Sequence, residues 1–204
     1  MKKIFITATN TDIGKTYTTL KLLQEYAKAG LSVAALKPIE TGVDATPPDG
    51  MKLLTLSQTL NPRLKNITIE DVVPITFTLP AAPFIAAQGE KIAFEKIHKS
   101  IHKFENLCDV LLIEGAGGLY VPIEKEYFMI DLIKDLNVDK TVLVTHCSLG
   151  CINDTLLSYN ALQEHNLQTE VVFNCKKEDN SFISVSKPYF DAVGFEIKTY
   201  KDIV

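Results

Sequence analysis

The chain has 204 residues, and its 21 basic and 25 acidic residues leave a net charge of −4. That length suits one domain over residues 1–204 with a substantial core, and the hydrophobic share of 46% is ordinary for a globular protein. No run of like charges favours nucleic acid or an acidic membrane surface, so we expect neither as a partner. No apolar run reaches the ~18 residues of a membrane span or forms the core of a signal peptide, so we expect a cytoplasmic protein.

Apolar runs alternate with helical patterns along the chain, which is typical of βαβ units around a mainly parallel sheet. Lys3–Thr7 is the first predicted strand, and a predicted helix at 14–29 follows it. Further strands are predicted at 32–37, 109–114, 140–146 and 169–174, and further helices at 51–60, 92–107, 127–136 and 152–165. Three prolines within residues 73–83 predict an extended surface loop or edge, and the residues after Lys176 show no clear pattern. This order predicts an α/β fold.

The cysteines show no metal-binding or redox pattern. Cys108, Cys147, Cys151 and Cys175 form no C-x-x-C pair. Cys147 and Cys151 are four residues apart, but Gly150 lies between them and no further zinc ligand is near. We expect the cysteines to be buried or reduced thiols.

The segment Ala8–Thr16, ATNTDIGKT, follows the first predicted strand and nearly matches the phosphate-binding loop G-x-x-x-x-G-K-[ST]. In such a loop Gly14 lets the backbone approach closely, Lys15 reaches the β- and γ-phosphates, and the Thr16 hydroxyl binds Mg²⁺. Alanine replaces the first glycine, but alanine fits wherever φ stays negative. The alternative is a capped helix start with a solvated Lys15.

Two more strand ends strengthen the case for a nucleotide. In DVLLIEGAGG, residues 109–118, a buried strand delivers Glu114 to the edge of the sheet where open α/β folds bind ligands, and a carboxylate there can hold Mg²⁺. Lys37 ends the second predicted strand, which we expect beside the first, so Lys37 and Lys15 would converge on one γ-phosphate. A tight turn after Glu114 and a solvated Lys37 are the alternatives. Together with the loop, these residues favour a nucleoside triphosphate site.

Two later strand ends offer polar groups. The segment Ser148–Asn153, SLGCIN, precedes a predicted helix, and its glycine and free N–H groups suit a carboxylate, although a plain glycine-containing loop explains it equally well. Asn174 closes the last predicted strand and could offer its amide to a nucleotide base, or merely cap the strand.

Taken together, these motifs resemble those of the dethiobiotin synthetase family of P-loop NTPases over most of the chain. The matching elements, in order, are T-x-T-D-I-G-K-T (9–16), K-P-I-x-T-G (37–42), Asp49 before a short helix, P-x-x-P-x-x-A (80–86), E-G-A-G-G (114–118) and L-G-C-I-N (149–153). This set is far more specific than a phosphate loop by itself. The resemblance implies a single-domain P-loop NTPase fold with a mainly parallel central sheet flanked by helices.

The resemblance also implies a reaction of biotin biosynthesis that uses ATP and Mg²⁺. One amine of 7,8-diaminononanoate traps CO₂ (or bicarbonate) as a carbamate, and the carbamate oxygen attacks the γ-phosphate of ATP. The second amine then closes on the mixed anhydride, which gives dethiobiotin, ADP and phosphate. In this family a homodimer holds the substrate carboxylate across its interface.

Site residues follow from the matching positions. The resemblance implies catalytic roles for Lys37, Lys15 and Thr11, and metal binding by Thr16, Asp49 and Glu114. The implied nucleotide-binding residues are Asp12, Ile13, Gly14, Lys15, Thr16, Tyr17, Asp49, Glu114, Gly115, Ala116, Gly117 and Asn174. The implied substrate-binding residues are Thr11, Asp12, Lys37, Thr41, Gly118, Leu149, Gly150, Cys151, Ile152 and Asn153.

One departure and one competing class complete the predictions. Where G-x-I-P usually frames the adenine and ribose, the nearest string is Gly194–Lys198, GFEIK, so we predict loose discrimination among nucleoside triphosphates. The competing class is the nucleotide-switched ATPases that position plasmids or division proteins. Those proteins carry a lysine early in the loop, where this chain has Asn10.

Overall fold

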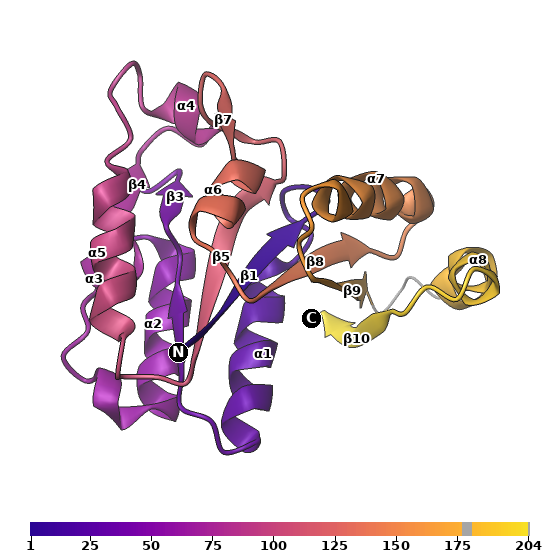
Figure 1. Cartoon of the computed structure of the whole chain (residues 1–204), viewed down its shortest axis with the longest axis horizontal. Helices are drawn as coiled ribbons and strands as arrows, with labels where there is room; N and C mark the ends of the chain where they lie inside the picture. Colours follow the sequence, from indigo (N-terminus) through magenta and orange to yellow (C-terminus); the bar gives the residue numbers. More distant parts are fainter. Residues whose placement is uncertain (177–180, 204) are drawn as a thin grey trace.

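The computed structural model describes residues 1–176 and 181–203, and a six-stranded sheet forms its centre (Figure 1). The strand order is β10-β9-β8-β1-β5-β2, and every neighbouring pair runs parallel. The strands are β1 (Lys2–Ala8), β2 (Val33–Leu36), β5 (Val110–Gly118), β8 (Lys140–His146), β9 (Thr169–Lys176) and β10 (Lys198–Ile203). Since all run the same way, the segments that follow them gather at one edge of the sheet. The predicted α/β fold with a parallel sheet is confirmed.

Helices cover both faces of this sheet. They are α1 (Lys15–Lys28), α2 (Pro48–Leu60), α3 (Ile69–Val72), α4 (Pro83–Ala86), α5 (Phe94–Phe104), α6 (Met129–Asp135), α7 (Cys151–Glu164) and α8 (Lys187–Ala192), with a 3₁₀ turn η1 (Pro62–Leu64) and a π-helical turn η2 (Phe182–Ser186). The crossovers through α1 and α7 advance in opposite directions along the sheet, and right-handed crossovers then put these two helices on opposite faces. Within the described part of the chain, no helix is both long and apolar enough to cross a membrane.

The middle of each central strand is a continuous apolar run because both of its faces are covered. Ile4, Phe5 and Ile6 of β1 have no exposed surface, and neither have Leu112 and Ile113 of β5. Runs of this kind, without alternation, are expected of a parallel sheet between two helical layers. The core therefore lies directly behind the edge at which the loops gather.

The position predicted for the second strand was wrong. β2 does not lie beside β1, because β5 lies between them. The crossover through α1 is long enough to pass over one strand position, which the later strand β5 then fills. Lys37, just after β2, is consequently brought to the neighbourhood of β5.

Several predicted bounds shift by a few residues. α2 begins at Pro48, three residues before the predicted start, since proline suits the first turn of a helix. Residues 127–128 form β7 (Tyr127–Phe128), which pairs with β6 (Pro122–Glu124), before α6 begins. The proline-rich segment holds β4 (Ile75–Phe77), which pairs with β3 (Ile39–Thr41) outside the main sheet.

The prediction of thiols was wrong for two cysteines. Cys147 and Cys175 are buried, as expected, but they form a disulfide with their Cα atoms 5.0 Å apart. The register explains the pairing, because His146 of β8 lies opposite Asn174 of β9, and the two cysteines follow this pair directly. Their sequence separation of 28 hides the pairing in the sequence. Cys108 and Cys151 are buried outside this disulfide.

Aromatic side chains hold the C-terminal elements, for which the sequence offered no pattern. The ring of Phe173 in β9 lies 4.7 Å from that of Phe182 and 5.1 Å from that of Phe190. Phe195 in turn contacts Phe190 and, on α7, Tyr159. These contacts attach η2 and α8 to the sheet.

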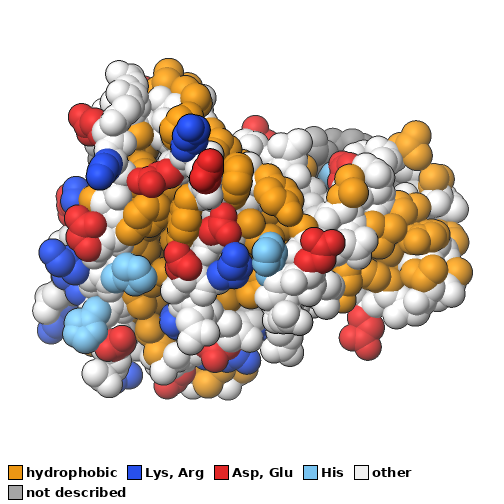
Figure 2. All heavy atoms as spheres, turned by 45° about the horizontal axis from the view of Figure 1, so that its top comes forward, with side chains coloured by type: hydrophobic (Ala, Val, Ile, Leu, Met, Phe, Trp, Pro, Cys, Tyr) orange, Lys and Arg blue, Asp and Glu red, His pale blue; other side chains and the backbone are white. Residues whose placement is uncertain are grey.

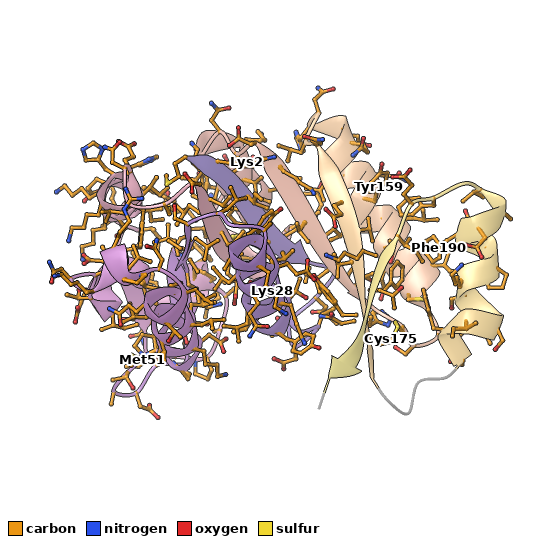
Figure 3. The ribbon with its side chains drawn as sticks, turned by 90° about the horizontal axis from the view of Figure 1, so that it is seen from below. Lys2, Lys28, Met51, Tyr159, Cys175 and Phe190 are labelled. Atoms are coloured by element: carbon orange, nitrogen blue, oxygen red, sulfur yellow. A yellow bond between two sulfur atoms is a disulfide. The ribbon has the colours of Figure 1, made fainter. Side chains whose placement is uncertain are left out.

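The same end of the molecule also exposes apolar surface. Hydrophobic side chains gather there in the space-filling view (Figure 2), and Ile183, Val185 and Val193 are each more than half exposed, at 55%, 55% and 54%. Figure 3 shows α8, with Phe190, beside α7, with Tyr159. Phe195 links the two helices, because its ring contacts those of Tyr159 and Phe190.

Candidate functional site

A cleft of about 440 Å³ opens at the carboxyl edge of the central strands. Segments after β1 and β2, the end of β5 and the start of α2 all contribute to it. Its lining comprises Thr11, Asp12, Gly14, Lys15, Thr16, Lys37, Ile39, Glu40, Thr41, Pro48, Asp49, Glu114, Ala116 and Gly117. Most of the residues expected at a nucleotide and its metal therefore meet in one hollow.

The loop after β1 leads into α1 through a glycine, whose backbone conformation other residues rarely adopt. Gly14 has a φ of 91° and is the N-cap of α1, so Lys15 is the first residue of the helix. The Lys15 side chain is buried, and its Nζ donates a hydrogen bond to the Asn10 carbonyl at 3.2 Å. Burial, followed by the nearby charge of Lys37, lowers the pKa of Lys15 to about 8. A buried ammonium group whose pKa is lowered in this way would be stabilised by a polyanionic ligand.

Lys37 and Glu114 form a buried ion pair at the floor of the cleft. The Lys37 Nζ lies 2.7 Å from Glu114 Oε1, and the two side chains are 6% and 0% exposed. Burial acts against the charge of Lys37, but the charge and hydrogen bond of Glu114 outweigh it and raise the Lys37 pKa. Lys37 is therefore charged at neutral pH. A lysine has three donors, so two remain for other acceptors.

Two threonines of α1 complete the contacts of Glu114. The Thr16 hydroxyl donates to Oε1 at 2.8 Å, and the Thr19 hydroxyl donates to Oε2 at 2.9 Å. Sequence reasoning missed Thr19, although its spacing of three from Thr16 places both on one face of a helix. Glu114 thus ties β5 and α1 to Lys37.

Asp49 enters the cleft from the first turn of α2. Its Oδ2 lies 3.9 Å from the Lys37 Nζ, and its Oδ1 lies 3.0 Å from the exposed Lys52. Burial acts against its charge, but Lys37 and then Lys52 lower the pKa of Asp49 overall. Glu40, which sequence reasoning also missed, lies behind this turn, and burial raises its pKa. Its place in K-P-I-E-T-G, three residues after Lys37, was the available signal.

The donor set is suited to a magnesium ion that is also held by phosphate. Thr16, Asp49 and Glu114 bring one hydroxyl and two carboxylates to the cleft. Among the described residues, no group of three His, Cys, Asp or Glu side chains is arranged to hold a metal ion without help. Mg²⁺ is commonly bound by one or two carboxylates together with water and substrate phosphates, and these residues fit that pattern.

Several expected nucleotide residues lie outside the cleft. The Asn174 amide donates to the carbonyls of Ile13 and Gly14 at 3.0 and 3.1 Å, so it supports the loop from β9. Gly115 is buried, and an added Cβ would lie 2.8 Å from Phe5. Tyr17 lies edge-on to Tyr200 of β10, with ring centroids 6.4 Å apart.

The residues expected at the substrate carboxylate also lie outside the cleft. Gly118 lines a neighbouring hollow, with Asn10, Tyr120 and Leu157 among its other residues. Residues 149–153 form the start of α7 and the loop before it, where Leu149 is 87% exposed. Within one chain these groups do not join the cleft, whereas Thr11, Asp12 and Thr41 do.

Comparison with known proteins gives a consistent family. A family model described as AAA domain matches residues 2–198. The chain is 48% identical to the ATP-dependent dethiobiotin synthetase BioD of Sulfurovum sp., with 95% of this chain and 91% of that protein covered. Identity is 42% to the protein of that name from Wolinella succinogenes, covering 93% and 88%, and 36% to that from Helicobacter pylori, covering 92% and 88%.

Solved structures share the fold at low sequence identity. The MinC:MinD cell division protein complex of Aquifex aeolicus contains a chain with a TM-score of 0.58 and 19% identity, covering 97% of this chain and 79% of that one. A ParA family ATPase from Chlorobium tepidum gives a TM-score of 0.57 and 15% identity, covering 100% and 86%. At these identities the likeness concerns the fold alone.

Proposed function

The chain belongs to the ATP-dependent dethiobiotin synthetase family, and on this premise we propose that its single domain, residues 1–204, closes 7,8-diaminononanoate with CO₂ to give dethiobiotin. The enzyme is thus an ATP-using ligase of biotin biosynthesis, and the ring closure and its magnesium requirement are our proposal. The observation that carries it is the meeting of Lys15, Lys37, Thr16, Asp49 and Glu114 around one cleft.

The proposed chemistry brings two anions together. A carbamate oxygen attacks the γ-phosphorus of ATP, and the bond from that phosphorus to the bridging oxygen of ADP breaks. The second amine then attacks the carbamoyl carbon, its proton is lost, and phosphate leaves. Lys15 and the two remaining donors of Lys37 would offset the repulsion between carbamate and γ-phosphate and hold them in line. The hydroxyl of Thr11 would orient the amine end of the substrate.

The metal fits the same cleft. We propose that Thr16, Asp49 and Glu114 hold Mg²⁺, which when bound neutralises charge on the phosphates of ATP. Glu114 already accepts hydrogen bonds from Thr16 and Lys37, so it would act with its partners as a fixed unit.

A second copy of the chain would complete the substrate site. We propose that Asp12 and Thr41 lie near the diamine and that Gly118 and residues 149–153 hold the substrate carboxylate across a homodimer interface. The exposure of Tyr120 (60%) and Leu157 (65%) in the hollow beside Gly118, and of Leu149 (87%) just before α7, supports this arrangement. Light scattering of the purified protein tests it, and a monomeric mass at working concentration would contradict it.

The central experiment measures phosphate release and dethiobiotin, by mass spectrometry, from ATP, 7,8-diaminononanoate and bicarbonate. We expect turnover that requires both the diamine and bicarbonate and that stops when EDTA removes Mg²⁺. Hydrolysis of ATP at the same rate without the diamine would instead indicate a nucleotide-switched ATPase. We also propose a cytoplasmic location, where ATP is available, and cell fractionation would test this.

A further inference from the structure

Glu40 lies in the cleft, and none of the proposed roles uses it. It belongs to β3, and its side chain is 4% exposed. Its Oε1 accepts a hydrogen bond from the backbone N–H of Asp49, and its Oε2 accepts one from that of Gly50, both at 2.9 Å. Each oxygen of this buried carboxylate is therefore held by the start of α2.

Those two amides are the ones that α2 leaves without a partner. The first four residues of a helix, counted from its N-cap, have no carbonyl within the helix to receive their N–H groups. In α2 the first two are Pro47 and Pro48, which have no N–H, and Met51 already donates to the Pro47 carbonyl at 2.9 Å. Glu40 takes both remaining groups, so a residue of another element caps the helix.

Asp49 presents its carboxylate to the cleft from this same turn. Its ion pair with Lys52 is largely exposed, and such pairs fix a side chain only weakly. Its distance of 3.9 Å from Lys37 is long for a hydrogen bond. The position of the Asp49 carboxylate therefore depends on where the backbone of the first turn lies.

Packing holds the same turn from its other side. An added Cβ on Gly50 would lie 2.1 Å from Val73 Cγ2 and 3.3 Å from Glu40 Oε2. The backbone at Gly50 thus lies close against Val73 on one side and is bonded to Glu40 on the other.

We propose that Glu40 is the positioning residue for Asp49, fixing the first turn of α2 so that Asp49 meets the divalent cation of the bound nucleotide. Glu40 acts through the helix start and not by contact with the cation. The inference rests on the proposed function, because Asp49 receives its metal role there.

Calorimetric titration with AMPPNP, in Mg²⁺ and in EDTA, tests this on wild type, E40Q, D49N and the double variant. Glutamine turns an NH₂ group toward one of the two backbone amides and loses that hydrogen bond. We expect E40Q to weaken Mg²⁺-dependent binding about 10- to 100-fold, in line with other residues that orient a metal ligand. Binding in EDTA should not change, and E40Q should add no further loss to D49N.

Two more variants serve as a replacement and a control. E40A removes the cap without introducing a donor, and it replaces E40Q in the cycle if that variant does not fold. D109N is the matched control, because the Asp109 carboxylate also accepts a hydrogen bond from a backbone N–H, that of Ser32 at 2.8 Å, just before β5 and so at the opposite end of that strand from the cleft. D109N should leave Mg²⁺-dependent binding unchanged.

Wild-type binding by the folded Glu40 variant in Mg²⁺ would overturn the inference, and so would an equal additional loss in the D49N background. If D49N itself binds as wild type in Mg²⁺, both the inference and the metal role of Asp49 are wrong. Failure of the proposed reaction looks different, since wild type would then bind the Mg²⁺ complex of the nucleotide and form no dethiobiotin.

Discussion

The cleft and the C-terminal region are held together by different forces. Around the cleft, the side chains of Lys37, Thr16 and Thr19 all donate hydrogen bonds to the buried carboxylate of Glu114. In the C-terminal region, aromatic rings of β9, η2 and α8 pack together. Asn174 connects the two, because it belongs to β9 and donates to the loop after β1.

This difference separates two tasks of a nucleotide site. A network of fixed charges sets where phosphate and metal can lie before any ligand arrives, which is what phosphoryl transfer requires. Apolar packing fixes no hydrogen-bonding pattern for a base. We therefore expect strict demands on the charged cleft and tolerance at the C-terminal region.

Removing Lys37 should give the largest effect. In K37A we expect diamine-dependent phosphate release to fall about 10²- to 10³-fold, as for loss of other preorganised charge stabilisers. Glu114 would also be left buried without its partner, at a loss of about 3 kcal/mol of unfolding free energy. The control is K134A, an exposed lysine far from the cleft that pairs with Asp131, which should behave as wild type. Unchanged turnover in K37A would refute the role given to Lys37.

Reducing the disulfide should chiefly affect stability. The chain between Cys147 and Cys175 is closed into a loop, and opening it should lower the unfolding free energy by about 3 kcal/mol. Urea unfolding with and without dithiothreitol measures this, and C175S should lose the response to the reductant. Alkylation of the untreated protein at all four cysteines would contradict the disulfide. Because disulfides are rare in cytosolic proteins, the same alkylation in cell extracts would show whether this pair is oxidised in the cell.

Nucleotide selection should be the tolerant property. We expect GTP and CTP to support dethiobiotin formation with kcat/KM within about tenfold of ATP, because the aromatic packing seen in the described C-terminal residues does not discriminate between bases by hydrogen bonding. Competition of each nucleotide against ATP in one reaction measures the ratio directly. A strong preference for ATP over GTP and CTP in this competition would show that the C-terminal region specifies a base after all.

The protonation of Lys15 should give the smallest signal. With its pKa lowered to about 8, Lys15 is half protonated at pH 8 in the free enzyme, and bound phosphate favours the charged form. Binding of ATP at pH 8 should therefore take up about half a proton, and the affinity should fall as pH rises above 8. Calorimetry in buffers of different ionisation enthalpy measures the uptake, and K15M should show none. Net proton release by wild type would contradict the depressed pKa.

The sequence predicted those parts of the fold and site that local patterns determine. The loop after β1, the helix behind it and the buried strand ending near Glu114 follow from apolar runs and a spaced motif. Contacts between segments far apart in the sequence could not be predicted from such patterns. Lys37 was expected beside the first strand, but it pairs with Glu114 because β5 occupies the place between β1 and β2.

Two further features depend on how distant segments are placed, which no local pattern encodes. The disulfide arises only because β8 and β9 end side by side. The capping of α2 by Glu40 arises because β3 passes the start of that helix. The C-terminal elements were missed for a different reason, since their order comes from aromatic contacts with β9 and α7 and not from a strong periodicity of their own.

The close approach of Gly50 to Val73 has an evolutionary consequence. A methyl group at position 50 cannot be accommodated while valine stays at position 73, since the two carbons would be 2.1 Å apart. A descendant of this chain should therefore acquire a larger residue at 50 at the least cost after position 73 has become smaller. Homologues that carry a side chain at 50 should mostly be those that lack the bulk of valine at 73.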